Sequence, residues 1–441
     1  MGATKWGAHL GIGPIFLTDI LLACAALTQV RQRTEGRFGV SAVLLAFFAY
    51  CCVRFATGPH SLTALRDFTP YGYAAVAVLP AAAAVAGKHV RDRSVRLLSW
   101  ALAFHLIWVT MAVAVPSAVA AAPQLGGFGG AGIFRVRTDV DMAVLGVTAA
   151  LYLWRYAAGG ARRHVLGVVW CVAVAARMNS RAGFIALVLV LATTFFLTVT
   201  RPAPGNRRTL VLVGAAPALV VGLLVAIPLT VGGGKLTASL GLTPASSEVD
   251  RSGINTARGR EQAWTDVRQW TADQHARTLG VGFGRNFLAE SGALVPLGSN
   301  PDLRSPHNYF IGTYARLGLV GVGLFVLLLG TIVRDAWAVT RGPVDDLALL
   351  AILTPPALVA VATFGVVLES PFGAVPFFWF VGILAADARR VRSLRAARSV
   401  SALGGPGRGA TRGAYLIGSG SQQTGDAVDE LGSQPVQVWQ S

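Results

Sequence analysis

Charge is scarce in this chain. Of its 441 residues only 13% are charged, whereas 54% are hydrophobic, and the mean hydropathy is +0.57. A soluble protein of this length needs far more polar surface to cover its core. Several apolar stretches also reach the roughly 20 residues that a helix needs to cross the hydrocarbon core of a bilayer. The composition therefore excludes a soluble globular protein and indicates a membrane protein.

Cysteine is scarce too, and several patterns are missing. The four cysteines lie in apolar stretches, which indicates neither a disulfide framework nor a metal site: Cys24, Cys51, Cys52 and Cys171. The residue alternation of an outer-membrane barrel is absent, and no internal repeat is evident. Leu21-Leu22-Ala23-Cys24 is similar to a lipoprotein cleavage box, but Asp19 interrupts its apolar run and the basic cluster follows it, which argues against cleavage.

The apolar segments predict an all-α polytopic membrane protein with about 11 transmembrane helices, in a range of about 10–12. The predicted helices span residues 10–30, 37–56, 68–87, 95–120, 139–158, 164–179, 181–200, 209–231, 306–333, 344–368 and 371–388. Pro80, Pro217 and the Pro355-Pro356 pair lie inside apolar runs, where they predict kinks.

This pattern divides the chain into four parts. Residues 1–231 hold the N-terminal transmembrane helices, and residues 306–388 hold the C-terminal ones. Between them, residues 232–305 form one long extracytoplasmic loop that is partly helical. Residues 389–441 form a basic and then disordered tail, since from about 400 they are rich in Gly, Ser and Gln with no apolar period.

Positive charge exceeds negative charge, with 38 Lys and Arg against 21 Asp and Glu. The basic clusters fall in alternate loops, which the positive-inside bias assigns to the cytoplasm. They lie at 31–37, 88–96, 155–163, 201–208, 334–341 and 389–398. Such clusters are typical of topological anchors facing anionic lipid, and no nucleic-acid partner is predicted. The C-terminus is then cytoplasmic, the long loop faces outward, and the external N-terminus predicts that a further N-terminal helix is missing.

An arginine stands on the outer side, in Asn179-Ser180-Arg181, between two predicted helices with almost no loop. An arginine at a helix end often only extends its side chain to lipid headgroups. Here, however, the positive charge lies opposite to where the bias favours it, which points to a specific anionic partner.

The long loop contains a predicted amphipathic helix at 256–277, which carries Arg258, Arg260 and Trp264. Tryptophan and apolar residues recur at three-to-four spacing on one face, which suits a membrane interface. The plainer alternative is that Arg260 pairs with Glu261 or Asp266 on the solvated face, a contact of little energetic value.

A histidine follows the long loop, in Ser305-Pro306-His307-Asn308-Tyr309. Pro306 favours the first turn of a helix, so His307 and Asn308 are predicted at a helix N-terminus. That end favours an anion and lowers the pKa of a histidine, which keeps it neutral as a general base requires. A structural histidine is the alternative.

Glycines are clustered in Gly280-Val281-Gly282-Phe283-Gly284. Glycine spacing of this kind binds a dinucleotide only between a strand and a helix of a βαβ unit, and no such unit is predicted here. The segment is instead predicted to be a flexible outer turn leading into a disordered stretch at 290–304.

Taken in order, these motifs resemble those of the O-antigen ligase and polymerase family, whose members transfer lipid-linked saccharides in bacterial membranes. The features that carry the resemblance are Ser180-Arg181 before an apolar helix, Arg260-x-x-x-Trp264, Leu279 through Gly284, and His307-Asn308-Tyr309-Phe310 followed by Leu317 through Gly321. Each motif alone is weak, and the ordered set over about 170–335 is specific. A further family segment is degraded, because Gly132 through Asp139 lacks its Pro-Asn pair, which puts the roles of Arg135 and Arg137 in doubt.

The resemblance implies a glycosyltransferase on the outer face of the cytoplasmic membrane. Its donor would be a saccharide on a polyprenyl diphosphate, its acceptor a glycan or lipid-glycan hydroxyl, and its surroundings membrane lipid. Arg181 and Arg260 would bind the diphosphate and His307 would accept the acceptor proton. The supporting residues would be Arg258, Trp264, Asn308 and Tyr309, with Arg135 and Arg137. No D-x-D cluster stands in the outer segments, and the diphosphate linkage supplies the energy, so no nucleotide, metal or other cofactor is expected.

Two other classes of function remain open. A transporter or flippase of lipid-linked oligosaccharide would place ionisable residues near the bilayer midplane, where Asp19 and Arg54 are the few candidates. A receptor or scaffold would explain the long loop but not a convergence of Arg181, Arg260 and His307. The sequence does not distinguish ligase from polymerase, because both share these motifs.

Overall fold

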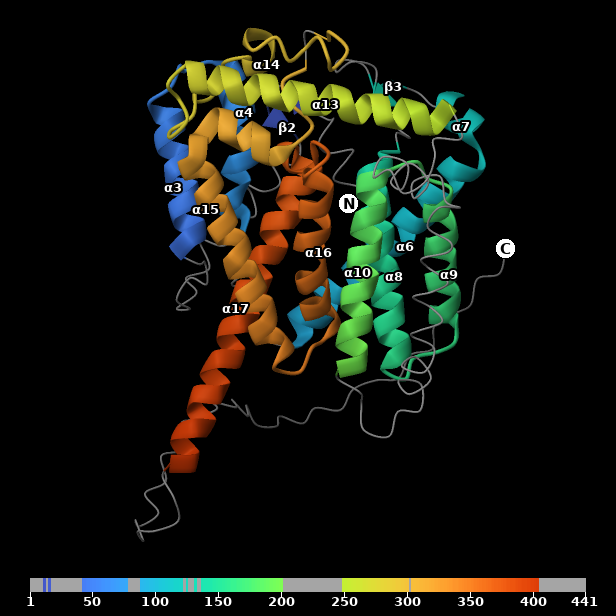
Figure 1. Cartoon of the computed structure of the whole chain (residues 1–441). Helices are drawn as coiled ribbons and strands as arrows, with labels where there is room; N and C mark the ends of the chain where they lie inside the picture. Colours follow the sequence, from blue (N-terminus) through green and yellow to red (C-terminus); the bar gives the residue numbers. More distant parts are fainter. Residues whose placement is uncertain are drawn as a thin grey trace, which may run out of the picture. The chain divides into compact units, whose positions relative to one another are not determined.

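A computed structural model describes residues 11–12, 15–16, 42–77, 88–121, 124–125, 131–132, 136–200, 248–300 and 303–403. Helices dominate these residues (Figure 1), as predicted, and the strands among them are two-residue pairs: β1 (Gly11–Ile12) with β2 (Ile15–Phe16), and β3 (Gln124–Leu125) with β4 (Ala131–Gly132). The first pair shows that the helix predicted from residue 10 was wrong at its start. In the sequence Pro14 lies between these strands, and proline disfavours helix in the residue before it.

One group of helices is built around α8 (Thr138–Ala157), which is buried along most of its length. It packs against α9 (Arg163–Ala176), α10 (Arg181–Thr200), α16 (Asp346–Ala362) and α6 (Lys88–Ala114). The contact with α10 is close because Gly183 carries no side chain: a Cβ there would lie 2.6 Å from Cβ of Met142. Small residues allow this approach of two apolar helices in a membrane protein.

A second group contains α3 (Ala42–Ala56), α4 (Leu62–Gly72), η1 (Tyr73–Ala77) and α15 (Tyr309–Thr340). Its core is aromatic: the ring of Phe325 lies 5.8 Å from that of Phe47 and 4.9 Å from that of Tyr309. These residues are almost fully buried and belong to the largest apolar cluster, which also includes residues of α16 and of α17 (Pro371–Leu403). The described part of the chain up to Arg395 forms one compact unit.

Among the residues that the structure describes, four helices are long and apolar enough to cross a membrane, namely α6, α10, α15 and the 371–397 part of α17. The shorter apolar helices are α3, α9 and α16. The prediction of about 11 transmembrane helices stays a prediction. Residues 209–231, the Pro80 and Pro217 positions and the tail after 403 lie outside the described residues.

Several predicted helix boundaries were wrong. In the described part of the helix predicted at 68–87, residues 68–77 belong instead to the end of α4 and to the 3₁₀ turn η1. The helix predicted at 95–120 starts earlier as α6 and is followed by the short α7 (Pro116–Ala121). The helix predicted to end at 388 continues as α17 to Leu403, since the basic residues there do not break a helix. Helix α16 runs through both Pro355 and Pro356.

The long polar segment contains α13 (Glu248–Asp273), which lies across one end of the upright helices (Figure 1). Its apolar face is not free for lipid, contrary to the predicted interfacial helix. Ala263 and Val267 of that face are fully buried against Phe287 and Leu288 of α14 (Phe287–Glu290) and Ala315 of α15. The same cluster includes Ala293, Leu294, Leu297 and Leu303. The prediction of disorder from 290 was therefore wrong for the described part of that stretch, because its apolar side chains have a core to pack against.

The glycine-rich segment 280–284 packs against a kink in α15, and this contact is called the joint below. Gly280 and Gly318 both have positive φ, at 75° and 64°, and the kink lies at Gly318. A Cβ on Gly280 would lie 2.4 Å from the backbone of Arg316, and one on Gly318 would lie 2.2 Å from the carbonyl oxygen of Thr278. Only glycine fits either position. The prediction of a flexible turn was wrong.

Hydrogen bonds hold the joint on both sides. The N–H groups of Val281 and Gly282 donate to the carbonyls of Ala315 and Arg316, at 2.8 and 3.0 Å. From α3, Arg54 donates to the carbonyl of Gly280 at 2.9 Å. Arg54, which the sequence offered as a residue near the bilayer midplane, thus binds the backbone of the polar segment. The joint fixes the start of α15 relative to α13.

Candidate active site

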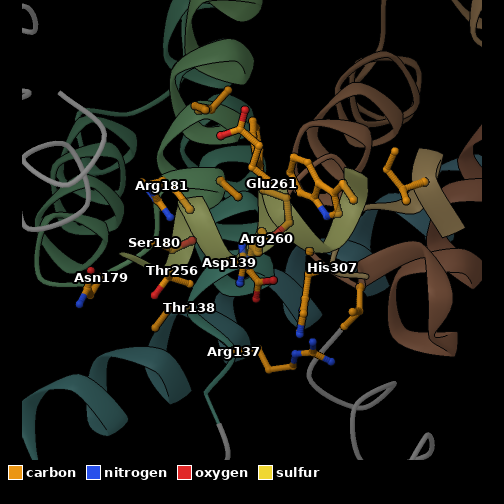
Figure 2. Close-up of a pocket in the computed structure, with 18 of the residues that line it drawn as sticks. Arg137, Thr138, Asp139, Asn179, Ser180, Arg181, Thr256, Arg260, Glu261 and His307 are labelled. Carbon is orange, nitrogen blue, oxygen red and sulfur yellow. The ribbon is translucent and has the colours of Figure 1, made fainter. Parts of the chain in front are cut away.

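A cavity of about 770 Å³ lies between α8, α10, α13 and the residues just before α15. Its charged and polar lining includes Arg137, Asp139, Ser180, Arg181, Arg260, Glu261, Arg268 and His307, and several of these side chains point toward one another in Figure 2. The residues predicted as the core of the site, Arg181, Arg260 and His307, therefore meet at one cavity. They come from the start of α10, from α13 and from the loop before α15, which are far apart in the chain.

Arg181 is positioned by the start of α10. The hydroxyl of Ser180 accepts a hydrogen bond from the N–H of Gly183 at 3.1 Å, which caps the first turn. Arg181 is the first residue of the helix and lines the cavity beside Ala182 and Ile185. The Ser-Arg pair thus combines a helix cap with a cation at the cavity wall.

Arg260 and Trp264 lie one turn apart on α13 and anchor two different segments. Arg260 donates to the carbonyl of Phe364 at 2.9 Å. Trp264 donates through Nε1 to the carbonyl of Pro306 at 2.7 Å, immediately before His307. The alternative of a solvated pair with Asp266 is not what forms, since Asp266 accepts from Gln262. Burial, followed by Arg181, lowers the pKa of Arg260, whereas Asp139 raises it.

His307 precedes α15 and is not part of it. The helix begins at Tyr309, and the side chain of Asn308 caps it by accepting from the N–H groups of Phe310 and Ile311. The helix predicted from 306 therefore starts three residues late. His307 has a φ of 55°, a left-handed conformation that non-glycine residues rarely adopt and that concentrates at functional sites.

The imidazole of His307 is held neutral. Burial lowers its pKa to about 4, and the positive charges of Arg260 and Arg137 act in the same direction, opposed by Asp139. The predicted direction of this shift was right, but the predicted cause was not, because desolvation and the two arginines account for it.

A buried polar network holds the backbone before His307. Ser305 donates to Glu369 at 2.7 Å and accepts from the N–H of His307 at 3.3 Å. Glu369, in η3 (Val367–Glu369), also forms an ion pair with Arg316 at 3.3 Å. Arg316 in turn donates to the carbonyl of Arg304 at 2.9 Å. These contacts, with that of Trp264, fix the loop in its left-handed conformation.

Residues 166–326 match the family model described as O-antigen ligase. The chain contains an O-antigen ligase domain. No curated protein matches the chain. The O-antigen ligase match includes Arg181, Arg260 and His307, and it confirms the family that the motifs predicted. It indicates a glycosyltransferase-like enzyme of the ligase and polymerase type in polysaccharide biosynthesis and, with the apolar helices, a protein of the bacterial inner membrane.

The O-antigen ligase motifs divide into two kinds in this structure. Ser180-Arg181, Arg260 with Trp264, and His307 lie at the cavity or hold its walls. The two glycine motifs instead form the joint that positions the start of α15. The other predicted supporting residues lie elsewhere, because Asn308 caps the helix and Tyr309 is buried with its ring 5.7 Å from that of Tyr71. Arg258 is exposed.

The degraded O-antigen ligase segment still contributes to the cavity. Arg137 lines it, with the guanidinium 4.5 Å from the centre of the Phe372 ring. The backbone N–H of Arg137 donates to the carboxylate of Asp141 at 2.7 Å. Arg135 lies outside the described residues.

Some residues of the site carry no recognisable signal in the sequence. Asp139 and Arg268 line the cavity, and Glu369 holds the loop before His307. An acidic residue in the first turn of a predicted helix is ordinary, so Asp139 gave no signal of its own. Glu369 lay between two predicted transmembrane helices, and nothing local linked it to Ser305, which lies 64 residues away.

Proposed function

We propose that this protein transfers a saccharide from a polyprenyl diphosphate carrier to a sugar hydroxyl on the outer face of the cytoplasmic membrane. The observation that carries the proposal is the single cavity at which a neutral histidine and several arginines meet. The O-antigen ligase match supports the class of reaction. The positive-inside bias supports the orientation, with the C-terminus and the basic tail in the cytoplasm.

Arg181 and Arg260 bind the diphosphate of the donor. Transfer expels a polyprenyl diphosphate that carries several negative charges, and guanidinium groups bind phosphate oxygens with two parallel hydrogen bonds. Both arginines line the same cavity, and the positive charge of Arg181 lowers the pKa of Arg260. Preorganised cations in a partly buried site stabilise charge that develops on the leaving group.

His307 accepts the proton from the acceptor hydroxyl as that oxygen attacks the anomeric carbon. A base with a pKa of about 4 is neutral at every physiological pH, but it binds a proton weakly. The diphosphate offsets part of this weakness, because an anion beside Arg260 and Arg137 counteracts the two charges that, after burial, lower the pKa of His307. The histidine therefore becomes a stronger base when the donor is bound.

The remaining parts of the cavity suit the rest of the donor. Arg137 adds positive charge at the α8 side, and Trp264 holds the loop that carries His307. The apolar side chains of Ile185, Ile311 and Phe364 line the same cavity. The energy of transfer comes from the diphosphate linkage, so the proposed reaction needs no nucleotide.

The test replaces His307 with Ala in the full-length protein in membranes, with a labelled polyprenyl-diphosphate saccharide as donor. Transfer should fall by about 10²–10⁴-fold while the donor still binds, since this is the range that a general base contributes. His89→Ala, an exposed histidine in the first turn of α6, is the control. Undiminished transfer by His307→Ala would remove the histidine from the mechanism.

The same assay separates the related functions. A ladder of products indicates a polymerase, and one shifted acceptor indicates a ligase. A flippase of lipid-linked oligosaccharide would leave the diphosphate linkage of the labelled donor intact, and that result would overturn the proposal.

A further inference from the structure

The cavity contains a carboxylate to which the proposed mechanism gives no role. Asp139 lies in the first turn of α8 and lines the cavity. Its Oδ1 accepts a hydrogen bond from the N–H of Val140 at 2.9 Å, which fixes the orientation of the group. Its Oδ2 faces Gly365, where a Cβ would lie only 2.9 Å from that oxygen. A glycine opposite Asp139 thus leaves this oxygen space at the cavity wall.

Asp139 stands between the two parts of the proposed machinery. Its negative charge raises the pKa of Arg260 and also that of His307. Figure 2 shows its carboxylate next to Arg260, with His307 and Arg137 around it. Asp139 is therefore close enough for its charge to act on both the proposed anchor of the diphosphate and the group that takes the acceptor proton.

A carboxylate at this place opposes the binding of an anionic donor. Like charges at close range repel, and the partly buried cavity screens this repulsion less than water does. A carboxylate here would, however, attract any part of the substrate that becomes positive during the reaction. In glycosyl transfer that part is the donor sugar ring, whose anomeric carbon and ring oxygen share positive charge in an oxocarbenium-like transition state.

The anomeric carbon is held between the leaving oxygen and the attacking oxygen. With the diphosphate at Arg181 and Arg260 and the acceptor hydroxyl at His307, this carbon would lie between these residues, in the cavity that Asp139 also lines. We propose that Asp139 is a catalytic residue that stabilises the positive charge of the donor sugar in the transition state. This inference rests on the proposed function and adds a negatively charged residue to the arginines and the histidine of that mechanism.

The step is balanced without a covalent role for Asp139. The bond from the anomeric carbon to the diphosphate oxygen breaks, and its electron pair leaves with the diphosphate. The acceptor oxygen forms the new bond to that carbon, and its proton passes to His307. Asp139 forms no bond and transfers no proton, so its contribution appears in the transition state and not in the bound donor.

The test compares Asp139→Asn with wild type in the full-length protein in phospholipid nanodiscs. Binding of polyprenyl diphosphate should be equal or tighter in the variant, because a repulsive charge is gone. The kcat for transfer from polyprenyl-diphosphate saccharide should fall on the order of 10²-fold, as expected for a lost electrostatic contact in the transition state. Lower turnover without weaker binding is the signature of this role.

The control is Asp266→Asn on α13, the same chemical change at a residue that accepts from Gln262 outside the cavity lining. It should leave both quantities unchanged. If Asp139→Asn instead lowers binding, turnover and melting temperature together, Asp139 only stabilises the first turn of α8 and the inference is overturned. An unchanged kcat would also overturn it. If wild type neither binds polyprenyl diphosphate nor transfers the saccharide, the proposed function itself fails.

Discussion

Arginines gather at both ends of α8, and their surroundings differ. At its last turn Arg155 pairs with Asp346 at 2.8 Å. Near it Arg91 of α6 binds Asp345 and Asp387, at 2.8 and 2.7 Å. At its first turn, around the cavity, Arg137, Arg181, Arg260 and Arg268 outnumber the carboxylates of Asp139 and Glu261. Arg260 there donates to a backbone carbonyl.

The difference shows how one residue type serves two purposes. A buried guanidinium with two carboxylates fixes helices to one another, and Arg91 joins α6 to α16 and α17 in this way. A guanidinium that shares a cavity with few carboxylates keeps positive charge available to an anion. The first arrangement is predicted to matter for stability and the second for binding and turnover.

The largest effect is expected near the last turn of α8, where arginines pair with carboxylates. Replacing Arg91 with Gln leaves Asp387, which is buried, without its cation, and breaking such a pair costs about 3–5 kcal/mol. The half-exposed Asp345 places the result at the lower end of this range. The melting temperature of the purified protein should fall clearly, while the activity per folded molecule stays the same. Normal melting with reduced turnover would contradict the comparison.

The next largest effect is expected at the cavity, near the first turn of α8. Arg260→Gln should lower kcat/KM for the labelled donor by about 10²–10³-fold, the range for one lost transition-state donor, with little change in melting temperature. Arg258→Gln is the matched control, since this exposed arginine lies two residues earlier on the same helix. Equal losses in the two variants would show that general positive charge on α13, and not Arg260 itself, is what matters.

The smallest effect is a shift in titration. The pKa of His307 is about 4, below the ordinary 6.5, so at pH 5.5 the imidazole should stay neutral where an ordinary histidine is mostly protonated. Removing a positive neighbour favours the protonated form, so Arg260→Gln should raise this pKa toward 6.5. NMR of histidine-labelled protein without substrate measures both values. Arg155→Gln, at the opposite end of α8, should not change them, and a pKa near 6.5 in wild type would contradict the prediction.

The sequence reveals most where the signal is local. The 3.6-residue period and apolar length identified α8, α9, α10 and α16 to within a few residues at most ends. The sequence also predicted the apolar face of α13, but it did not predict which residues pack against that face. Lipid and a protein core both bury apolar side chains, so the pattern alone does not distinguish an interfacial helix from one packed on α14 and α15.

The order of motifs along the chain was sufficient to assign the family, and with it Arg181, Arg260 and His307 as candidates. The chain alone also determined the class, because so little charge in so long a sequence leaves no soluble alternative. Only the tertiary structure decided that these three residues meet at one cavity and that Asp139 stands among them. It also decided that the glycine motifs form a packed joint and that Glu369 holds the loop of His307. The reason is physical: helical periodicity is set by neighbouring residues, whereas a cavity is set by contacts between segments far apart in the chain.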